Sequence, residues 1–260
     1  MKILDLKPLA GGDYPDGLQR LDYVSDIDGL HDWATLLPGR RRELWIVALH
    51  GHGACGDQLY TRKDVRTIWL PEFLATGGGI ITLNLRGNAW MCPSAAADLH
   101  AVMHYLRAEH GLQKAIFCSG SMGGTSNLIY GVLHPEDVNA IVARGAATDL
   151  ASYYDWCLTQ PLPILKEIAE AIKTAYGAAP DQAPDLYRRH STLANHARLT
   201  VPVYFSHGGA DAIIPVEQAR RLAEEVRGRN NFAYYEVPGG DHDSPLHDKE
   251  GLGWVMERMG

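Results

Sequence analysis

The stretch 115–124 constrains the fold of this chain more than any other. It reads Ala-Ile-Phe-Cys-Ser-Gly-Ser-Met-Gly-Gly, an apolar run that stops at small residues around Ser121. A run compatible with a helix, Thr125 to Leu133, follows directly. This strand–turn–helix order is typical of a nucleophile elbow, in which a tight turn lifts a serine hydroxyl above the end of a parallel strand.

The neighbours of Ser121 fit the strained backbone that such a turn requires. Ser119 and Gly123 lie two residues away on either side, and Gly124 follows. All three are small, as close packing around the turn demands. The usual pattern is Gly-x-Ser-x-Gly, and here serine replaces the first glycine. A plain Gly/Ser-rich turn would give the same letters, so the interpretation depends on partners elsewhere in the chain.

Two later segments supply an acid and a base. Val201 to Ser206 is a predicted strand that runs into glycines, with Asp211 just past its end. Phe232 to Val237 is the predicted last strand, and His242 follows it. The chain order Ser…Asp…His is that of one class of serine hydrolases. The predicted nucleophile, acid and base are therefore Ser121, Asp211 and His242.

Other residues near the histidine could take two of these roles. Asp241 and Asp243 are alternative acids, and His247 is an alternative base. A carboxylate adjacent to His242 in the sequence would have difficulty reaching the far side of its ring. The assignment to Asp211 and His242 is accordingly preferred.

An early segment is the predicted source of an oxyanion hole. Leu44 to Leu49 is continuously apolar, as expected of a strand buried on both faces, and ends in His-Gly-His-Gly. Acyl transfer needs two N–H donors aimed at the developing oxyanion. The predicted donors are the N–H groups of Met122 and His52, with Gly53 as the neighbouring option. His50 and His52 lack a third ligand nearby, so we expect no metal there.

Composition and charge limit the class of protein. The chain has 260 residues, is 46% hydrophobic and carries a net charge of −7, which argues against nucleic acid or an anionic membrane as partner. No secretory signal and no membrane span is predicted, so a cytoplasmic location is expected. The four cysteines are too few for a disulfide framework, although Cys55 and Cys92 both follow predicted strands. The sequence gives no indication of the oligomeric state.

Strands and helices alternate along the chain. This order predicts a mostly parallel central sheet with helices on both faces, an α/β architecture. Asp28 and Gly29 separate two β-like runs, 21–27 and 30–37, so the sheet should begin with an antiparallel hairpin. Residues 147–200 interrupt the alternation and are expected to form a short helical, cap-like insertion within a single domain, 1–260.

Several further residues are candidates for contacts with a substrate or a metal ion. Arg86 and Arg144 follow predicted strands and could bind a carboxylate, or form structural salt bridges. Tyr154 and Trp156 in the insertion could line an acyl or sugar pocket, or form its core. His100 and His104 are four residues apart on a predicted helix, 93–109. We interpret these two histidines as structural, because two ligands do not make a metal site.

These motifs together resemble the α/β-hydrolase superfamily, in particular the catalytic domain of the prolyl oligopeptidase family and dienelactone-hydrolase-like esterases. The resemblance runs from Leu44 to the C-terminus. Five stretches carry it: 50–53, 119–124, 134–150, 187–191 and 207–215. The resemblance implies that Ser121, Asp211 and His242 are the nucleophile, acid and base, the same assignment that the sequence pattern predicts.

The resemblance also implies an activity. About 40 residues precede the first core strand, too few for the β-propeller of the true oligopeptidases. We therefore expect a serine hydrolase that cleaves a small carboxylic ester through an acyl-enzyme, without a cofactor. A serine peptidase acting on short peptides is the alternative, and a non-catalytic binding protein of the same fold is the third hypothesis.

Overall fold

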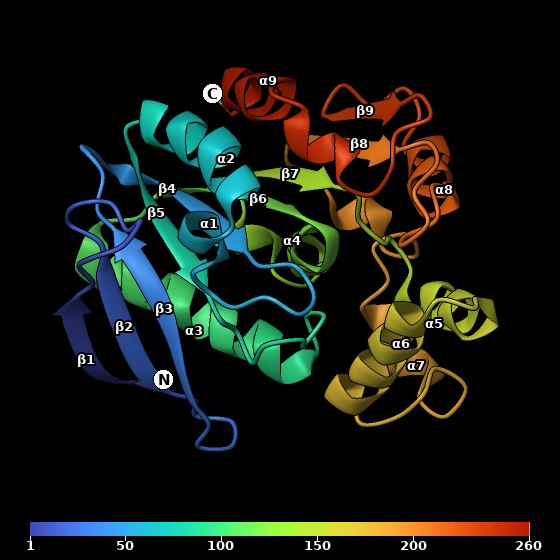
Figure 1. Ribbon diagram of the computed structural model, residues 1–260, viewed down its shortest axis with the longest axis horizontal. Helices are drawn as coiled ribbons and strands as arrows, with labels where there is room; N and C mark the ends of the chain where they lie inside the picture. Colours follow the sequence, from blue (N-terminus) through green and yellow to red (C-terminus); the bar gives the residue numbers. More distant parts are fainter. Residues whose placement is uncertain (260) are drawn as a thin grey trace.

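The computed structural model describes residues 1–259, whose strands form one nine-stranded sheet (Figure 1). The spatial order is β1-β2-β3-β5-β4-β6-β7-β8-β9. The first three strands and the β3–β5 pair are antiparallel, and every pair from β5 to β9 is parallel. The bounds are β1 Lys2–Pro8, β2 Gln19–Val24, β3 His31–Leu37, β4 Arg41–Leu49, β5 Gly78–Leu83, β6 Lys114–Gly120, β7 Ala140–Arg144, β8 Val203–Gly208 and β9 Phe232–Val237.

Helices cover both faces of this sheet. Their bounds are α1 Gln58–Thr61, α2 Lys63–Ala75, α3 Pro93–His110, α4 Ser121–Leu133, α5 Leu150–Thr159, α6 Pro163–Tyr176, α7 Pro184–Arg189, α8 Glu217–Glu225 and α9 Glu250–Arg258, with short 3₁₀ turns η1 Pro135–Asp137, η2 His196–Arg198 and η3 Ser244–His247. One apolar cluster joins α3, α4 and α8 to the sheet, and a second joins α1, α2 and α9. The predicted fold, a mostly parallel sheet between two helical layers, is confirmed.

The central strands are buried on both faces. All residues of β5 and β7 are buried, as are residues 44–49 of β4 and 115–120 of β6. Continuous apolar runs are the sequence pattern that such burial requires. The hairpin at Asp28 and Gly29 is also confirmed, although its connection is longer than two residues and spans 25–30. Asp28 Oδ1 accepts the N–H of Leu30 there at 3.2 Å.

The order of the strands determines where a site can form. The chain runs from β4 outward to β5 on one side and then crosses to β6 on the other side of β4. In open α/β sheets, such a reversal leaves a crevice at the carboxyl ends of the strands, where ligands bind. The loop after β4 contains His52, and the turn after β6 contains Ser121. Both predicted segments therefore lie at the switch point.

The segment 147–200 consists largely of helices α5, α6 and α7, which lie together beyond the carboxyl ends of the central strands (Figure 1). Helix α6 ends at Gly177 in a left-handed conformation, φ 76°. That this segment acts as a cap, and that the chain is a single domain, stay predictions. Within residues 1–259, none of the helices has both the length and the apolar character needed to cross a bilayer.

Candidate active site

Ser121 lies on a strained turn between β6 and α4. Its φ is 56°, in the left-handed region that a non-glycine residue rarely occupies. The first residue of α4 is therefore held at an angle that projects its side chain away from the strand. A Cβ atom at Gly123 would lie 2.2 Å from the carbonyl oxygen of Leu49, so only glycine fits at that position. The predicted elbow is present, with its steric requirement.

Ser119 has a structural function in this turn. Its Oγ accepts the N–H of Leu49 at 2.8 Å, and the residue is fully buried. The paired residues of the β4–β6 ladder end at Val47 and Phe117, so this hydrogen bond extends the link between the two strands. The hydroxyl explains why serine suits the position that glycine usually takes. The Ser119 hydroxyl is thus engaged, which leaves the half-buried Ser121 as the hydroxyl of the turn that can act as a nucleophile.

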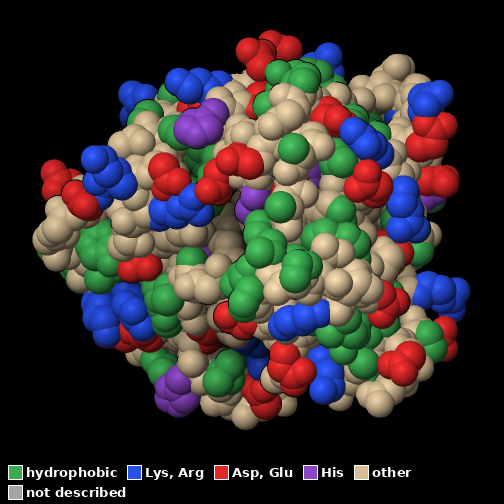
Figure 2. Space-filling model, turned by 45° about the vertical axis from the view of Figure 1, so that its right-hand side comes forward, with side chains coloured by type: hydrophobic (Ala, Val, Ile, Leu, Met, Phe, Trp, Pro, Cys, Tyr) green, Lys and Arg blue, Asp and Glu red, His purple; other side chains and the backbone are tan. Residues whose placement is uncertain are grey.

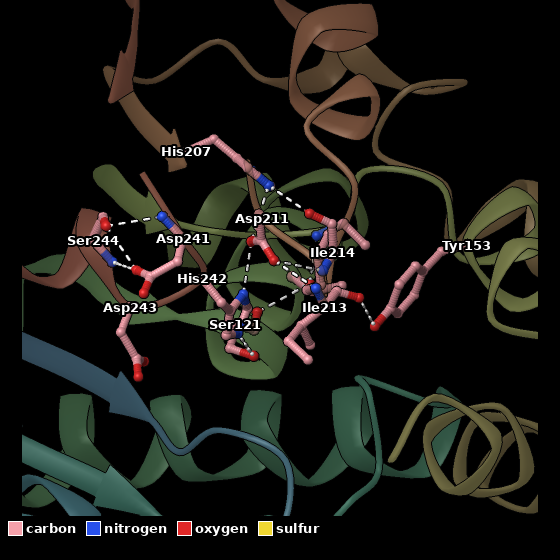
Figure 3. Close-up of polar contacts among 12 residues, drawn as sticks. Ser121, Tyr153, His207, Asp211, Ile213, Ile214, Asp241, His242, Asp243 and Ser244 are labelled. Carbon is pink, nitrogen blue, oxygen red and sulfur yellow. Dashed lines mark hydrogen bonds and ion pairs between the residues drawn. The ribbon is translucent and has the colours of Figure 1, made fainter. Parts of the chain in front are cut away.

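Three side chains form one hydrogen-bonded line at the end of the sheet (Figure 3). His242 Nδ1 lies 2.7 Å from Asp211 Oδ2, and His242 Nε2 lies 2.9 Å from Ser121 Oγ. An ionised carboxylate can only accept, so Nδ1 carries the proton and donates it. Nε2 then has a free lone pair, and Ser121 Oγ–H donates to it. The structure thus brings together the predicted nucleophile, base and acid.

Backbone and side-chain donors surround Asp211. Its Oδ1 accepts the N–H groups of Ile213 at 2.8 Å and Ile214 at 2.9 Å. Burial by itself raises the pKa of Asp211, but hydrogen bonds from His207 and His242 outweigh it and hold that pKa well below its ordinary value. The carboxylate is accordingly ionised and fixed in orientation, as a group that supports an imidazolium must be.

His207 is a neighbour of the triad whose function the sequence left open. It is fully buried near the end of β8, and its Nε2 lies 2.9 Å from the carbonyl oxygen of Ile214 and 3.3 Å from Asp211 Oδ2. Because both partners are acceptors, Nε2 carries the proton. The side chain therefore donates to Asp211 Oδ2, the oxygen that also accepts from His242. In the sequence, only the position of His207 four residues before Asp211 indicates that the two side chains could meet.

The alternative acids are engaged elsewhere. Asp241 Oδ1 accepts the N–H and the hydroxyl of Ser244, at 2.9 and 2.7 Å. Asp243 Oδ1 accepts from Arg62 Nη2 at 3.2 Å, and Figure 3 shows its side chain pointing away from the triad. The imidazole that contacts Ser121 belongs to His242 and not to His247. Geometry therefore supports the preferred assignment.

The loop after β4 contains one of the two residues whose N–H groups are predicted to be oxyanion donors. The N–H of Gly53 donates to Asn88 Oδ1 at 2.8 Å, so it is occupied and does not serve as the neighbouring option. Among the described residues, none accepts the N–H of His52. Met122 is the second residue of α4, so its N–H is one of the four without a carbonyl partner inside the helix. Both predicted donors remain free.

The imidazole of His52 ties this loop to two other segments. Trp90 Nε1–H donates to Nδ1 at 3.3 Å, so the ring proton is on Nε2, which donates to Glu167 Oε1 at 3.3 Å. Burial lowers the pKa of His52 and outweighs the opposing effect of Glu167, which keeps the ring neutral. The loop after β4 is thereby held between the loop after β5 and helix α6.

The loop after β5, residues 84–92, is strained. Leu85, Arg86, Trp90 and Met91 have positive φ values of 42°, 64°, 47° and 54°. Such strain persists only where surrounding contacts impose it, and it is frequent at functional sites. Here Tyr176 Oη donates to the carbonyl oxygens of Trp90 and Met91, at 3.1 and 3.3 Å. No local sequence pattern indicates the strain of this second supporting loop.

The triad opens into a cavity of about 270 Å³. One part of its lining is apolar, and Gln58, Arg62 and Asp243 make another part polar. Figure 2 shows a hollow near the centre of this face, with histidine and hydrophobic side chains beside it. The apolar lining residues are Leu49, Val65, Trp69, Ile164, Ile168, Ile213 and Leu246. The hydrocarbon part of a substrate would be accommodated there.

The structure does not bring the two arginines into this cavity. Arg86 forms ion pairs with Asp28 at 2.7 Å and Asp98 at 2.6 Å. Arg144 is buried, donates to Cys118 Sγ at 3.1 Å and lies over the ring of Trp69 at 4.8 Å. Neither residue lines the cavity, and the substrate-contact interpretation is replaced by a structural one. The two carboxylates compensate the charge of Arg86, whereas Arg144 is held by the Cys118 thiol, the carbonyl oxygen of Asp248 and the ring of Trp69.

The predicted aromatic contacts also lie outside the cavity lining. Tyr154 is buried, and Trp156 stacks on Tyr153 with ring centroids 6.1 Å apart. Both belong to the packing of α5, which is the other interpretation the sequence allowed. His50 contacts the carbonyl oxygens of Gly51 and Asn84 rather than sharing an open position with His52. All four cysteines are free, so Cys55 and Cys92 form no disulfide.

Part of this chain is similar in sequence to known hydrolases. A family model described as serine aminopeptidase, S33, matches residues 84–191. Esterase LipC of Mycobacterium tuberculosis is 37% identical over 70 residues, which cover 26% of this chain and 17% of that protein. The matched stretch is thus less than a fifth of the relative's length.

Solved structures resemble this one over most of the chain. FphF, a fluorophosphonate-binding serine hydrolase of Staphylococcus aureus, has a TM-score of 0.69 at 14% identity, covering 94% of this chain and 98% of its own. The Pyrococcus furiosus esterase Pf2001 has a TM-score of 0.68 at 13% identity, covering 98% and 99%. A puromycin hydrolase has a TM-score of 0.67 at 20% identity, covering 85% and 35%. These likenesses over nearly the whole chain show that it has the α/β-hydrolase fold.

Proposed function

We propose that this chain is a serine hydrolase that cleaves carboxylic esters through an acyl-enzyme. The observation that carries the proposal is the line of two hydrogen bonds, 2.9 and 2.7 Å, from Ser121 through His242 to Asp211. It has the geometry needed to activate a hydroxyl by an oriented general base. The esterases and serine hydrolases among its structural relatives support the same reaction class.

Acylation follows from the positions of these groups. Ser121 Oγ attacks the ester carbonyl carbon while His242 Nε2 takes its proton. Asp211 holds the imidazole tautomer and stabilises the imidazolium that forms. The oxyanion accepts hydrogen bonds from the N–H groups of Met122 and His52, each worth about 3 kcal/mol in comparable enzymes. His242 then gives the proton to the departing alkoxide, and the alcohol leaves.

Deacylation repeats these steps with water. His242 takes a proton from a water molecule as it attacks the acyl carbon, and returns the proton to Ser121 Oγ when the acid departs. Nucleophile, base, orienting acid and donors are all groups of the chain. We therefore propose that this reaction requires no cofactor.

The cavity favours a small ester over a peptide. Its volume of about 270 Å³ and its apolar lining suit a short acyl or alkyl group better than an extended chain of polar peptide units. A serine peptidase acting on short peptides remains the second candidate, because the matching family is described as serine aminopeptidase and a puromycin hydrolase shares the fold. In either case we propose a small molecule or short peptide, and neither nucleic acid nor membrane, as the partner.

A substrate panel tests the proposal. Wild type and Ser121→Ala would be assayed with aryl and alkyl esters of increasing acyl length and with peptide amides. We expect wild type to prefer short esters and Ser121→Ala to be inactive on all of them. Preference for peptide amides would reverse the order of the two candidates. Absence of turnover on the whole panel, with no reaction of Ser121 with an acylating probe, would leave a binding protein.

A further inference from the structure

We propose that His100 and His104 form a surface site for a divalent transition-metal ion such as Zn²⁺, oriented by buried Asp137. This group lies where α3 packs against the turn that follows α4. It is independent of the triad. Helix α4 has 13 residues and begins at Ser121 and ends beside His134, which places the group about 20 Å from the nucleophile.

The two imidazoles already have the separation that a metal requires. His100 Nε2 and His104 Nε2 lie 3.1 Å apart. Two Zn–N bonds of about 2.0–2.1 Å at a tetrahedral angle separate their nitrogens by about 3.3 Å. Residues four apart share one face of a helix, as in the paired histidines of helical zinc sites. An ion can therefore bind both nitrogens with almost no movement of the backbone.

Asp137 fixes the tautomer that leaves a lone pair on His100. Its Oδ2 lies 2.7 Å from His100 Nδ1, and its carboxylate is 1% exposed. Nδ1 therefore donates, and Nε2 faces His104 as an acceptor. A carboxylate that orients a histidine through its other ring nitrogen is the usual outer partner of a metal ligand. This contact is not visible in the sequence, where the two histidines are interpreted as structural; it orients one of the two protein ligands, and water supplies the other coordination positions.

The remaining neighbours hold this arrangement together. Arg107 Nη1 donates to Asp137 Oδ1 at 2.6 Å, and the hydroxyl of Tyr130 donates to Oδ2. The ring of His134 stacks on that of His100, with centroids 4.4 Å apart. In the metal-free protein His104 Nε2–H donates to His100 Nε2. Metal binding requires that this proton move to His104 Nδ1 or leave, and water completes the coordination shell.

Isothermal titration of the untagged, chelator-treated full chain with ZnCl₂ at pH 8 tests the site, because protons compete less with the metal at higher pH. We expect one equivalent of Zn²⁺ to bind, and no binding of Mg²⁺, which prefers oxygen ligands. His104→Ala should weaken the affinity at least tenfold. Asp137→Asn should weaken it about 10–100-fold if it folds. His31→Ala, at an exposed histidine of β3, is the matched control and should bind as wild type does.

Thermal unfolding gives a second readout that does not depend on activity. Excess Zn²⁺ should raise the Tm of wild type and of His31→Ala but not that of His104→Ala, since a ligand of the native state stabilises it. Absence of binding at 1 mM Zn²⁺, or equal affinity of wild type and His104→Ala, would overturn the proposal. Neither result bears on the proposed hydrolase reaction.

Discussion

His242 Nε2 lies 2.9 Å from Ser121 Oγ although 121 residues of sequence separate them. The serine is lifted by a strained turn, φ 56°, and the histidine arrives on the loop after β9. The hydrogen bond places a base beside a hydroxyl that could act as a nucleophile. Mutation of either residue should therefore change the catalytic rate.

The nucleophile assignment predicts a severe and specific loss. Ser121→Ala should reduce turnover by about a millionfold, as in comparable triads, and should leave the unfolding midpoint close to that of wild type. Ser119→Ala is the control at a neighbouring serine. It removes the acceptor of Leu49 N–H, so it should cost about 1–3 kcal/mol of stability yet retain most turnover. Steady-state ester kinetics and urea unfolding distinguish the two. More than a few per cent residual activity in Ser121→Ala would reject Ser121.

The acid assignment predicts a ranking among three carboxylates. Asp211→Asn should lower kcat about ten-thousandfold, because the amide favours the wrong tautomer of His242. Asp241→Asn and Asp243→Asn should remain within about threefold of wild type, since their oxygens contact Ser244 and Arg62 instead. Kinetics on purified, folded variants provide the measurement. The reverse ranking would show that the acid is misassigned.

The depressed pKa of Asp211 predicts a pH dependence of stability. A carboxyl whose pKa is lower in the folded than in the unfolded chain stabilises the fold above the unfolded pKa, about 3.9, and loses that contribution as the pH falls toward the folded pKa. Wild type should therefore lose about 1 kcal/mol more than Asp211→Asn between pH 5 and pH 3. Urea unfolding at both pH values measures this difference. Parallel losses in the two proteins would contradict it.

The contact between Trp90 and His52 predicts a positioning effect. Trp90→Phe keeps a ring but removes the N–H that donates to His52 Nδ1, so the oxyanion donor should be less well placed. We expect kcat to fall about tenfold with KM within about twofold. Trp45→Phe is the matched control, because it loses a similar hydrogen bond, 3.0 Å to the Arg42 carbonyl, at a distance from the site. Equal kcat values for the two variants would argue that Trp90 only packs.

Much of the fold was predictable because buried parallel strands leave a clear sequence pattern. The predicted last strand, Phe232–Val237, has the bounds of β9, and the apolar run at 44–49 lies inside β4. Strand β1 was missed. It pairs only with β2, and most of its residues are exposed, so it lacks the apolar run that identified the others.

The predicted triad residues could be identified because each follows a strand, whereas the contacts around them could not. Arg86 was correctly placed after a strand. Its partners Asp28 and Asp98 come from distant segments, and the order of residues in the sequence does not show which of them Arg86 will contact. The left-handed backbone at Leu85 and Trp90 is contrary to the preference of both residues. Only tertiary contacts impose it, and these are absent from local sequence patterns.

Covalent labelling identifies the nucleophile without a substrate. Wild type and Ser121→Ala would be incubated with a fluorophosphonate, and intact mass and peptide mapping would locate the adduct. We expect one phosphonyl group per chain, on Ser121, with loss of fluoride, and no label on Ser121→Ala. Denatured wild type should also remain unlabelled, because the unfolded hydroxyl has no base. Full labelling of Ser121→Ala, or an adduct on another residue of wild type, would contradict the proposed nucleophile and with it the mechanism.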